Sequence, residues 1–236
     1  LSAGLHLAMA TCSTLVLLPA LNLSQLLSTI RRTQPTIFPG VPPLFNTLAT
    51  HRNIEKYKLS SIRYCVSGGA PLPAEVRKSF EKLTGATLVD GYGLNETSPV
   101  VACNPRHVPS RVGSVGLPLP GTLVEIRSPD NKNKVLKTGQ TGEIYFKGPQ
   151  VMAGYWQKPM ETTEVLQKGW LRTGDVGFID SDGYIHLTDR LKDIIITNGY
   201  NVYPRAIEDA AYTHPAVHEV TAIAIPDPHK GEVAKV

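Results

Sequence analysis

The chain has 236 residues, of which 42% are hydrophobic, and it carries a formal net charge of +4. This composition excludes an intrinsically disordered protein and provides a core large enough for two domains. The charge is small and scattered, which argues against a nucleic-acid-binding protein. Cys12, Cys65 and Cys103 lack metal-ligand spacing, so a reduced intracellular setting fits best.

The first segment of the chain is apolar from Leu5 to Leu23, but polar residues and Pro19 interrupt it. We therefore expect buried elements of an α/β core there, not a transmembrane helix or a signal peptide. Leu15–Leu18 is predicted to be a buried strand. The apolar residues from Leu23 to Ile30 then recur at helical spacing, which predicts a helix ending near Arg31-Arg32.

The next segment alternates strands with helices, which is typical of a parallel sheet flanked by helices. One helix is expected around Leu44–His51, and a second has Val76, Phe80 and Leu83 as its buried stripe. Gly85 is expected to end the second helix. The expected strands are Thr36–Phe38, Ile62–Val66 and Ala86–Val89.

Two glycine-rich stretches, Ser67–Pro71 and Asp90–Thr97, follow successive parallel strands. Ligands bind at the carboxyl ends of such strands in open α/β sheets. The small residues of the first stretch leave room for a flat ring such as adenine. In the second, Tyr92 can stack on a base and Glu96 is a hard oxygen ligand for Mg²⁺. Considered alone, a tight turn, a core tyrosine and a solvated glutamate are the simpler interpretations.

The character of the sequence changes at Arg106, after which glycine and proline are frequent and β-branched runs are short. This pattern predicts a mostly antiparallel, barrel-like subdomain. After Lys192, a strand, an Asn198-Gly199 turn and a helix from Pro204 to Tyr212 indicate the start of a small α+β domain. The predicted divisions are residues 1–105, 106–191 and 192–236.

A hairpin is predicted from two short strands, Val176–Ile179 and Tyr184–Thr188, joined at Asp182-Gly183. Asp175 precedes the first strand and Arg190 follows the second, so their side chains should face one region. A carboxylate can accept two hydrogen bonds from a ribose diol, and a guanidinium can add a cationic fork. On pairing alone, a salt bridge that closes the hairpin is the favoured interpretation.

The stretch Gly169–Pro204 resembles the signature region of the adenylate-forming acyl-CoA synthetases, the superfamily that includes firefly luciferase and the adenylation domains of peptide synthetases. The resemblance extends through essentially the whole chain. Thr36–Pro42, Cys65–Pro73 and Asn201–Pro204 make it most similar to bacterial long-chain fatty acid–CoA ligases. It implies the same α/β fold class: a parallel sheet with flanking helices, a mostly antiparallel β-barrel-like subdomain, and the start of a small α+β domain.

The resemblance also implies site residues. Asp175 would hold the ribose hydroxyls, Arg190 would contact the same ribose, and Asp90, through its side chain or backbone, would contact the amino edge of adenine. Arg172 is interpreted as a surface or ribose-edge cation. The full set implied for ATP or AMP is Gly69, Ala70, Pro71, Asp90, Gly91, Tyr92, Asp175 and Arg190.

Further roles follow from the same resemblance. Glu96 would hold Mg²⁺, and Asn95 stands where the family usually has a threonine that touches the α-phosphate. Lys192 would lie at the hinge between a large and a small domain. Coenzyme A would pass beside Gly199 and Tyr200.

The implied activity is ATP-dependent fatty acid–CoA ligation, in which an acyl-adenylate forms and coenzyme A then displaces AMP. A ligase for aryl, short-chain or amino acids and a non-catalytic AMP- or acyl-binding module are the alternatives left open. The implied location is the cytoplasm, with peripheral contact at the inner membrane left open. The chain starts at Leu1 without methionine, and neither the family's phosphate loop nor its C-terminal lysine is present. We therefore interpret it as a fragment and expect little ligase activity from it alone.

Overall fold

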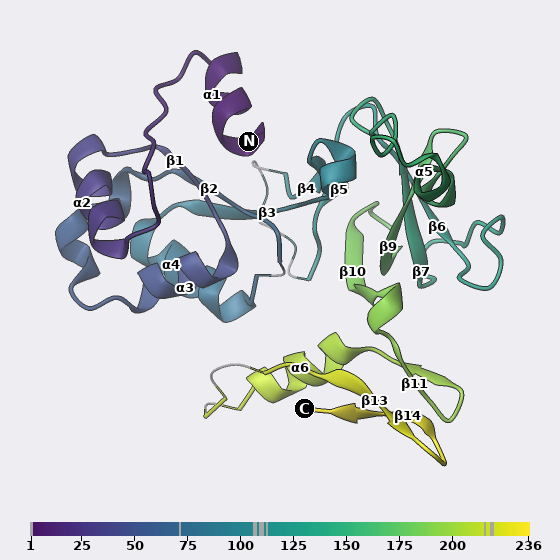
Figure 1. The fold of residues 1–236 in the computed structure, drawn as a ribbon. Coiled ribbons are helices and arrows are strands. Elements are labelled where there is room, and N and C mark those ends of the chain that lie inside the picture. The colour runs from purple at the N-terminus through teal and green to yellow at the C-terminus, as the bar shows by residue number, and fades with distance from the viewer. Residues whose placement is uncertain are drawn as a thin grey trace. The chain divides into compact units, whose positions relative to one another are not determined.

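The computed structural model describes residues 2–70, 72–105, 108, 111, 113–214, 216–217 and 220–236. The chain divides into two compact units, Leu1–Leu119 and Pro120–Val236 (Figure 1). The three-part division made from the sequence stays a prediction. Over the described residues, every helix is too short or too polar to cross a membrane.

The first unit contains a five-stranded sheet in the order β1-β2-β3-β4-β5. Its first three strands pair in parallel, and the last two add antiparallel pairs. This arrangement confirms the expected parallel sheet. The strands are β1 (Ile37–Gly40), β2 (Tyr64–Ser67), β3 (Thr87–Gly93), β4 (Val100–Cys103) and β5 (Leu117–Pro118).

The helices of this unit begin and end where local chemistry favours it. The Asn22 side chain accepts the Gln25 N–H at 3.1 Å and so caps the start of α2. Gly85 ends α4 with φ of 72°, as predicted. The elements are η1 (Ser2–His6), α1 (Leu7–Ala10), α2 (Leu23–Thr33), α3 (Pro42–Thr50), η2 (Ile54–Tyr57), η3 (Leu59–Ser61), α4 (Ala74–Thr84) and η4 (Asn95–Thr97).

The core of the first unit lies between its sheet and the helices, and in Figure 1 α3 and α4 lie together beside β1–β3. Phe45 from α3 and Phe80 from α4 are fully buried, and their rings meet edge to face at 5.0 Å. Phe80 therefore occupies the expected core position. Val76 and Leu83 are only partly buried against this core, while Arg77 and Thr84 share the buried face with Phe80.

The strand predicted at Leu15–Leu18 is wrong, because this segment has no regular secondary structure and pairs with none of the described strands. Leu15, Val16 and Leu17 are exposed, with Leu17 keeping 77% of its accessible surface, and only Leu18 is partly buried against the core. The two edge strands of this sheet are β1 and β5, and both contain proline: β1 is four residues long with Pro39, and β5 is Leu117–Pro118. A proline removes a ladder donor, so these edges offer little pairing to a neighbour.

Strand β3 is longer than predicted and continues through the glycine-rich stretch to Gly93. Thr87–Asp90 pairs in parallel with β2, whereas Gly91–Gly93 pairs antiparallel with β4. The close approach of β4 requires glycine, since a Cβ atom at Gly93 would overlap the backbone carbonyl of Pro99. The glycines thus let one strand change partners beside the candidate ligand loops.

Replacing Gly93 with alanine is expected to destabilise the protein by about 3 kcal/mol, because backbone atoms must move to admit the methyl group. Gly68→Ala is the matched control, since its added Cβ would meet the Gly91 carbonyl at an ordinary 3.7 Å. Chemical denaturation of both variants measures the difference. Equal stability of the two variants would contradict the tight crossing of β3 and β4.

The second unit begins with a curled antiparallel sheet in the order β10-β9-β7-β6, with β8 paired to β9. It confirms the predicted barrel-like subdomain, and the predicted hairpin forms its β9–β10 edge. The elements are β6 (Leu123–Arg127), β7 (Gly142–Lys147), α5 (Pro159–Val165), β8 (Leu166–Gln167), β9 (Trp170–Ile179) and β10 (Ile185–Arg190).

A small α+β segment follows η5 (Leu191–Asp193), as predicted. Its sheet has the order β12-β11-β14-β13. Asn198 and Gly199 have φ of 49° and 79°, as the tight turn between β11 and β12 requires. Its elements are β11 (Ile195–Thr197), β12 (Tyr200–Val202), α6 (Pro204–Tyr212), β13 (Ile223–Asp227) and β14 (Gly231–Lys235).

Candidate functional site

The two glycine-rich stretches of the first unit lie side by side. Ser67 and Asp90 are register partners at the end of the parallel pairing. A Cβ atom placed on Gly68 would lie 3.7 Å from the Gly91 carbonyl oxygen, so the two backbones adjoin there. Gly69 and Ala70 are exposed. The structure therefore offers a bare backbone surface of the kind that a flat base needs, while Pro71 lies outside the described residues.

The residues after β3 form the short helix η4. Asn95 is exposed and Glu96 is half-buried. The Thr97 hydroxyl is fully buried, accepts the Leu94 N–H at 2.9 Å and lies 2.7 Å from the Pro99 carbonyl oxygen. Thr97 thus fixes the turn that presents Glu96.

Tyr92 is 8% exposed, which places most of its ring in the protein interior. Tyr92 is therefore packed as a core tyrosine, which agrees with the simpler of the two interpretations. A base that stacks on Tyr92 would use the small part of the ring that remains accessible. Its role toward a nucleotide stays a prediction.

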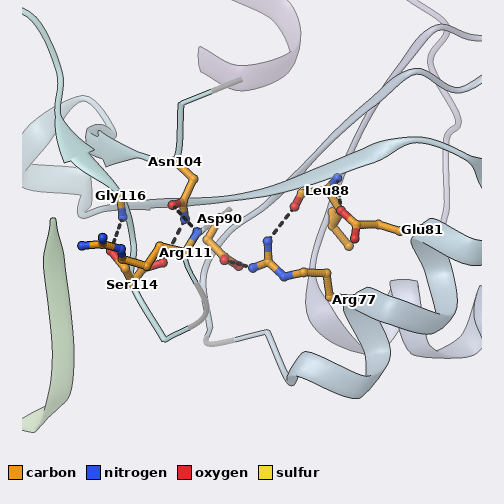
Figure 2. A network of polar contacts seen from close by, with 8 residues as sticks. All are labelled: Arg77, Glu81, Leu88, Asp90, Asn104, Arg111, Ser114 and Gly116. Atoms are coloured by element: carbon orange, nitrogen blue, oxygen red, sulfur yellow. Dashed lines mark hydrogen bonds and ion pairs between the residues drawn. The ribbon is translucent and has the colours of Figure 1, made fainter. Parts of the chain in front are cut away.

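A polar network that the sequence did not predict surrounds Asp90 (Figure 2). Arg77 on α4 forms an ion pair with the Asp90 carboxylate and donates a second hydrogen bond to the Leu88 carbonyl at 2.7 Å. Glu81, one turn along α4, accepts the Leu88 N–H at 2.9 Å. Burial lowers the pKa of the Arg77 guanidinium, while the nearby Glu81 carboxylate raises it.

One signal in the sequence could have located Arg77. It stands three residues before Phe80, at the spacing of the buried helical face. A cation at such a position requires a buried partner. Asp90, the acidic residue at the end of the following strand, is one such candidate in the sequence.

In the second unit, Asp175 and Arg190 are opposite one another in the β9–β10 pairing. The Arg190 Nε lies 3.0 Å from the Asp175 Oδ1. Asp175 is 6% exposed, and the Thr173 hydroxyl accepts its N–H at 3.0 Å. The salt bridge that closes the hairpin is therefore present, and the ribose-binding role stays a prediction.

A cavity of about 330 Å³ lies beside this pair, and its wall is rich in cations. Glu143, which is 1% exposed, fixes Arg172 in that wall through a 2.7 Å contact with its Nε. A wall of this kind favours an anionic ligand, because several guanidinium and ammonium groups face it. The lining residues are Val165, Arg172, Thr173, Gly174, Arg190, Leu191 and Lys192.

The residues implied for the hinge and for coenzyme A are exposed. Lys192 lies in η5 directly after β10. Gly199 and Tyr200 lie at the tip of the β11–β12 hairpin, and Tyr200 is 75% exposed. Their roles in domain rotation and in binding coenzyme A stay predictions.

Comparison with known proteins decides the family. The model of the AMP-binding enzyme family matches residues 1–156. The chain belongs to the AMP-binding enzyme family. Long-chain-fatty-acid–CoA ligase of Bacillus subtilis is 46% identical over 221 residues, which are 94% of this chain and 39% of that protein. Feruloyl-CoA synthase of an Amycolatopsis species is 39% identical and is covered to 45% of its length.

Solved structures agree with this assignment. Amide bond synthetase McbA from Marinactinospora thermotolerans superposes with a TM-score of 0.86 at 39% identity, covering 94% of this chain and 45% of that one. ATP-bound MatB from Rhodopseudomonas palustris gives 0.88 at 31% identity, covering 97% and 45%. The chain spans about two fifths of the length of the curated relatives it matches.

This member of the AMP-binding family therefore brings its predicted residues together in two groups. In one unit, Ser67 and Gly68, directly before Gly69 and Ala70, adjoin Asp90 and Gly91. In the other, Asp175 and Arg190 pair beside the cavity that Lys192 lines. That both groups contact one bound nucleotide stays a prediction.

Proposed function

We propose that the chain is part of an ATP-dependent acid–thiol ligase whose substrate is a long-chain fatty acid. The observation that carries this proposal is the 46% identity with a long-chain-fatty-acid–CoA ligase over 94% of the chain. The paired Asp175 and Arg190 beside a cation-rich cavity support the nucleotide part. The fatty carboxylate would attack the α-phosphorus of ATP, releasing pyrophosphate. The thiol of coenzyme A would then attack the acyl carbon and release AMP.

The residues of this chain would act mainly by binding and orientation. Gly69, Ala70 and Asp90 would hold the base, and Asp175 with Arg190 would hold the ribose. Fixing the acid and ATP in a reactive geometry lowers the barrier by converting a bimolecular step into a unimolecular one. The cations beside β10 would offset negative charge that builds on the phosphates.

Glu96 has the right donor chemistry for Mg²⁺, which binds proteins through one or two carboxylates and completes its shell with phosphates and water. Across the part of the chain that the structure describes, three or more His, Cys, Asp or Glu side chains gather nowhere as a metal cage. A single half-buried carboxylate at Glu96 therefore suits an ion that arrives with ATP. When bound, that ion would neutralise phosphate charge.

A panel of acids tests the substrate class. We expect the whole protein to exchange pyrophosphate into ATP at least about 10-fold faster with palmitate than with ferulate or malonate, because a pocket that buries a long alkyl chain gains roughly 0.8 kcal/mol per methylene. Feruloyl-CoA synthase is a relative at 39% identity, so an aryl acid is the alternative substrate. Faster exchange with ferulate than with palmitate would identify an aryl acid, not a fatty acid, as the substrate class.

A second candidate is a non-catalytic AMP- or acyl-binding module, which Asn95 favours because it replaces the threonine expected at the α-phosphate. An amide can still donate a hydrogen bond, but its planar group is longer than a hydroxyl. Binding of AMP without pyrophosphate exchange for any acid in the panel would support the module. Exchange with at least one acid would exclude it.

A further inference from the structure

Side chains of α4 cover the edge of β3 that the sheet leaves unpaired. The Thr87 N–H donates to the Arg63 carbonyl toward β2, so the backbone groups of Leu88 point to the opposite edge. There β4 pairs only with Gly91–Gly93. Arg77 and Glu81 instead satisfy the carbonyl and the N–H of Leu88, at 2.7 and 2.9 Å. Helix α4 therefore holds β3 in place at Leu88, just before Asp90, where the parallel pairing of β3 with β2 ends.

The same arginine forms the ion pair with Asp90, as Figure 2 shows. The side chains of Arg77 and Asp90 are 10% and 17% exposed, so both charges are largely removed from water. A largely buried carboxylate without a partner would favour its protonated form. With the guanidinium in contact, the ionised form is favoured instead.

We propose that Arg77 is a positioning residue that keeps the Asp90 carboxylate ionised, so that Asp90 acts only as a hydrogen-bond acceptor and selects a base that presents an amino donor. This inference rests on the proposed nucleotide site. Arg77 contacts one carboxylate oxygen, Oδ2. An ionised carboxylate accepts at two oxygens, which leaves capacity for the exocyclic amino group of adenine.

The charge state of Asp90 has consequences for recognition. An ionised acceptor forms a charge-assisted bond with the amino group, about twice as strong as a neutral one. A protonated carboxyl group would present a donor and would discriminate less well. Asp90 thus recognises the base through its negative charge, and Arg77, which lies outside the glycine-rich stretch, maintains that charge.

Other ionisable groups lie near Asp90, and each bears on a pH experiment. Glu81 is on α4 with Arg77, and Cys65 is on the neighbouring strand β2. Cys103 on β4 is opposite Gly91, and the Arg111 N–H donates to Asn104, whose own N–H donates to the Asp90 carbonyl. Burial raises the pKa of the Cys65 thiol to about 12 and also raises that of Cys103, so both thiols stay neutral over the range used below.

The test compares ATP with purine riboside triphosphate, which lacks only the 6-amino group. We expect the wild-type protein to bind ATP about 10- to 100-fold more tightly, as for a hydrogen bond to a charged group, with the ratio constant from about pH 5.5 to 8.5. In Arg77→Met the pKa of Asp90 should rise. The preference for ATP should then be retained at high pH and lost as the pH falls.

Two further variants keep the test decisive if Arg77→Met fails to fold. Arg77→Lys keeps the cation and should keep a pH-independent preference. The double variant Arg77→Met/Asp90→Asn replaces the buried pair with neutral groups, a change that proteins commonly tolerate. The preference of this double variant for ATP over purine riboside triphosphate should fall to a few-fold at every pH. Lys78→Met, which removes an exposed cation from the same helix, is the matched control and should behave as wild type.

The outcomes separate the two proposals. A wild-type protein that binds neither triphosphate would overturn the proposed nucleotide site itself. A wild-type preference that persists unchanged in Arg77→Met/Asp90→Asn would overturn the role of Arg77 while leaving the site intact. A preference for ATP that does not change with pH in folded Arg77→Met would also overturn the role of Arg77 and leave the nucleotide site intact.

Discussion

Asp175→Ala is expected to weaken ATP binding by about 100-fold. Two hydrogen bonds from a ribose diol to a carboxylate contribute roughly 1.5–3 kcal/mol each, and part of this is recovered when water enters the site. A 100-fold change corresponds to about 2.7 kcal/mol. Titration calorimetry of the variant against ATP measures it directly.

The same substitution should change the stability of the fold little. Asp175 is buried, but its partner Arg190 keeps half of its side-chain surface in water. Arg190 can therefore be solvated when the carboxylate is removed, so the cost should stay below the roughly 3–5 kcal/mol of breaking a fully buried pair. A large loss of affinity with a small loss of stability would thus separate ligand binding from closure of the hairpin.

A nucleotide that lacks the ribose diol shows whether the lost affinity comes from contacts with that diol. ATP without its 2′ and 3′ hydroxyls should bind wild type and Asp175→Ala with equal affinity, because the lost contacts are those with the diol. Asp182→Ala, an exposed acid at the turn of the same hairpin, is the matched control. If Asp175→Ala bound ATP as tightly as wild type, the pair would be only a structural salt bridge.

Local signals located the elements whose ends depend on a single residue. Gly85 ends α4, Pro204 begins α6, and Asn198-Gly199 forms the turn that its two positive φ angles require. In each case the residue type fixes the backbone conformation whatever surrounds it. The proximity of Asp175 and Arg190 was predictable because a hairpin brings its two ends together, whereas their direct pairing also depends on an irregularity between Leu187 and Asp189 that shifts the register.

The features that depend on distant partners were not predictable from local signals. Leu15–Leu18 has the composition of a strand, but a strand also needs an edge to join, and β1 offers a poor one. The extension of β3 to Gly93 depends on the approach of β4, and glycine composition suggested a loop instead. Arg77 was not predicted to be buried, because the helical pattern was read from apolar residues alone. The burial of Arg77 depends on its ion pair with Asp90, which lies on a different element, β3.

Glu96→Gln should abolish most of the benefit that Mg²⁺ gives to adenylation. The substitution keeps the size of the side chain and removes the charge that a hard divalent cation prefers. Preorganised charge stabilisation of this kind is typically worth about 10²–10³-fold in rate. We therefore expect pyrophosphate exchange in the whole protein to slow by that factor, while the KM for the acid changes only a few-fold.

A binding measurement shows whether the loss comes from the metal ion. Wild type should bind ATP more tightly with Mg²⁺ than with a chelator present, and Glu96→Gln should lose most of that difference. Glu75→Gln, an exposed carboxylate on α4 that pairs with Lys78, is the control for a general change in charge. Because Thr97 fixes the backbone of η4 independently of residue 96, the variant should keep its fold. Exchange at the wild-type rate would therefore remove Glu96 from the metal site and leave the phosphates to be neutralised by the cations beside β10.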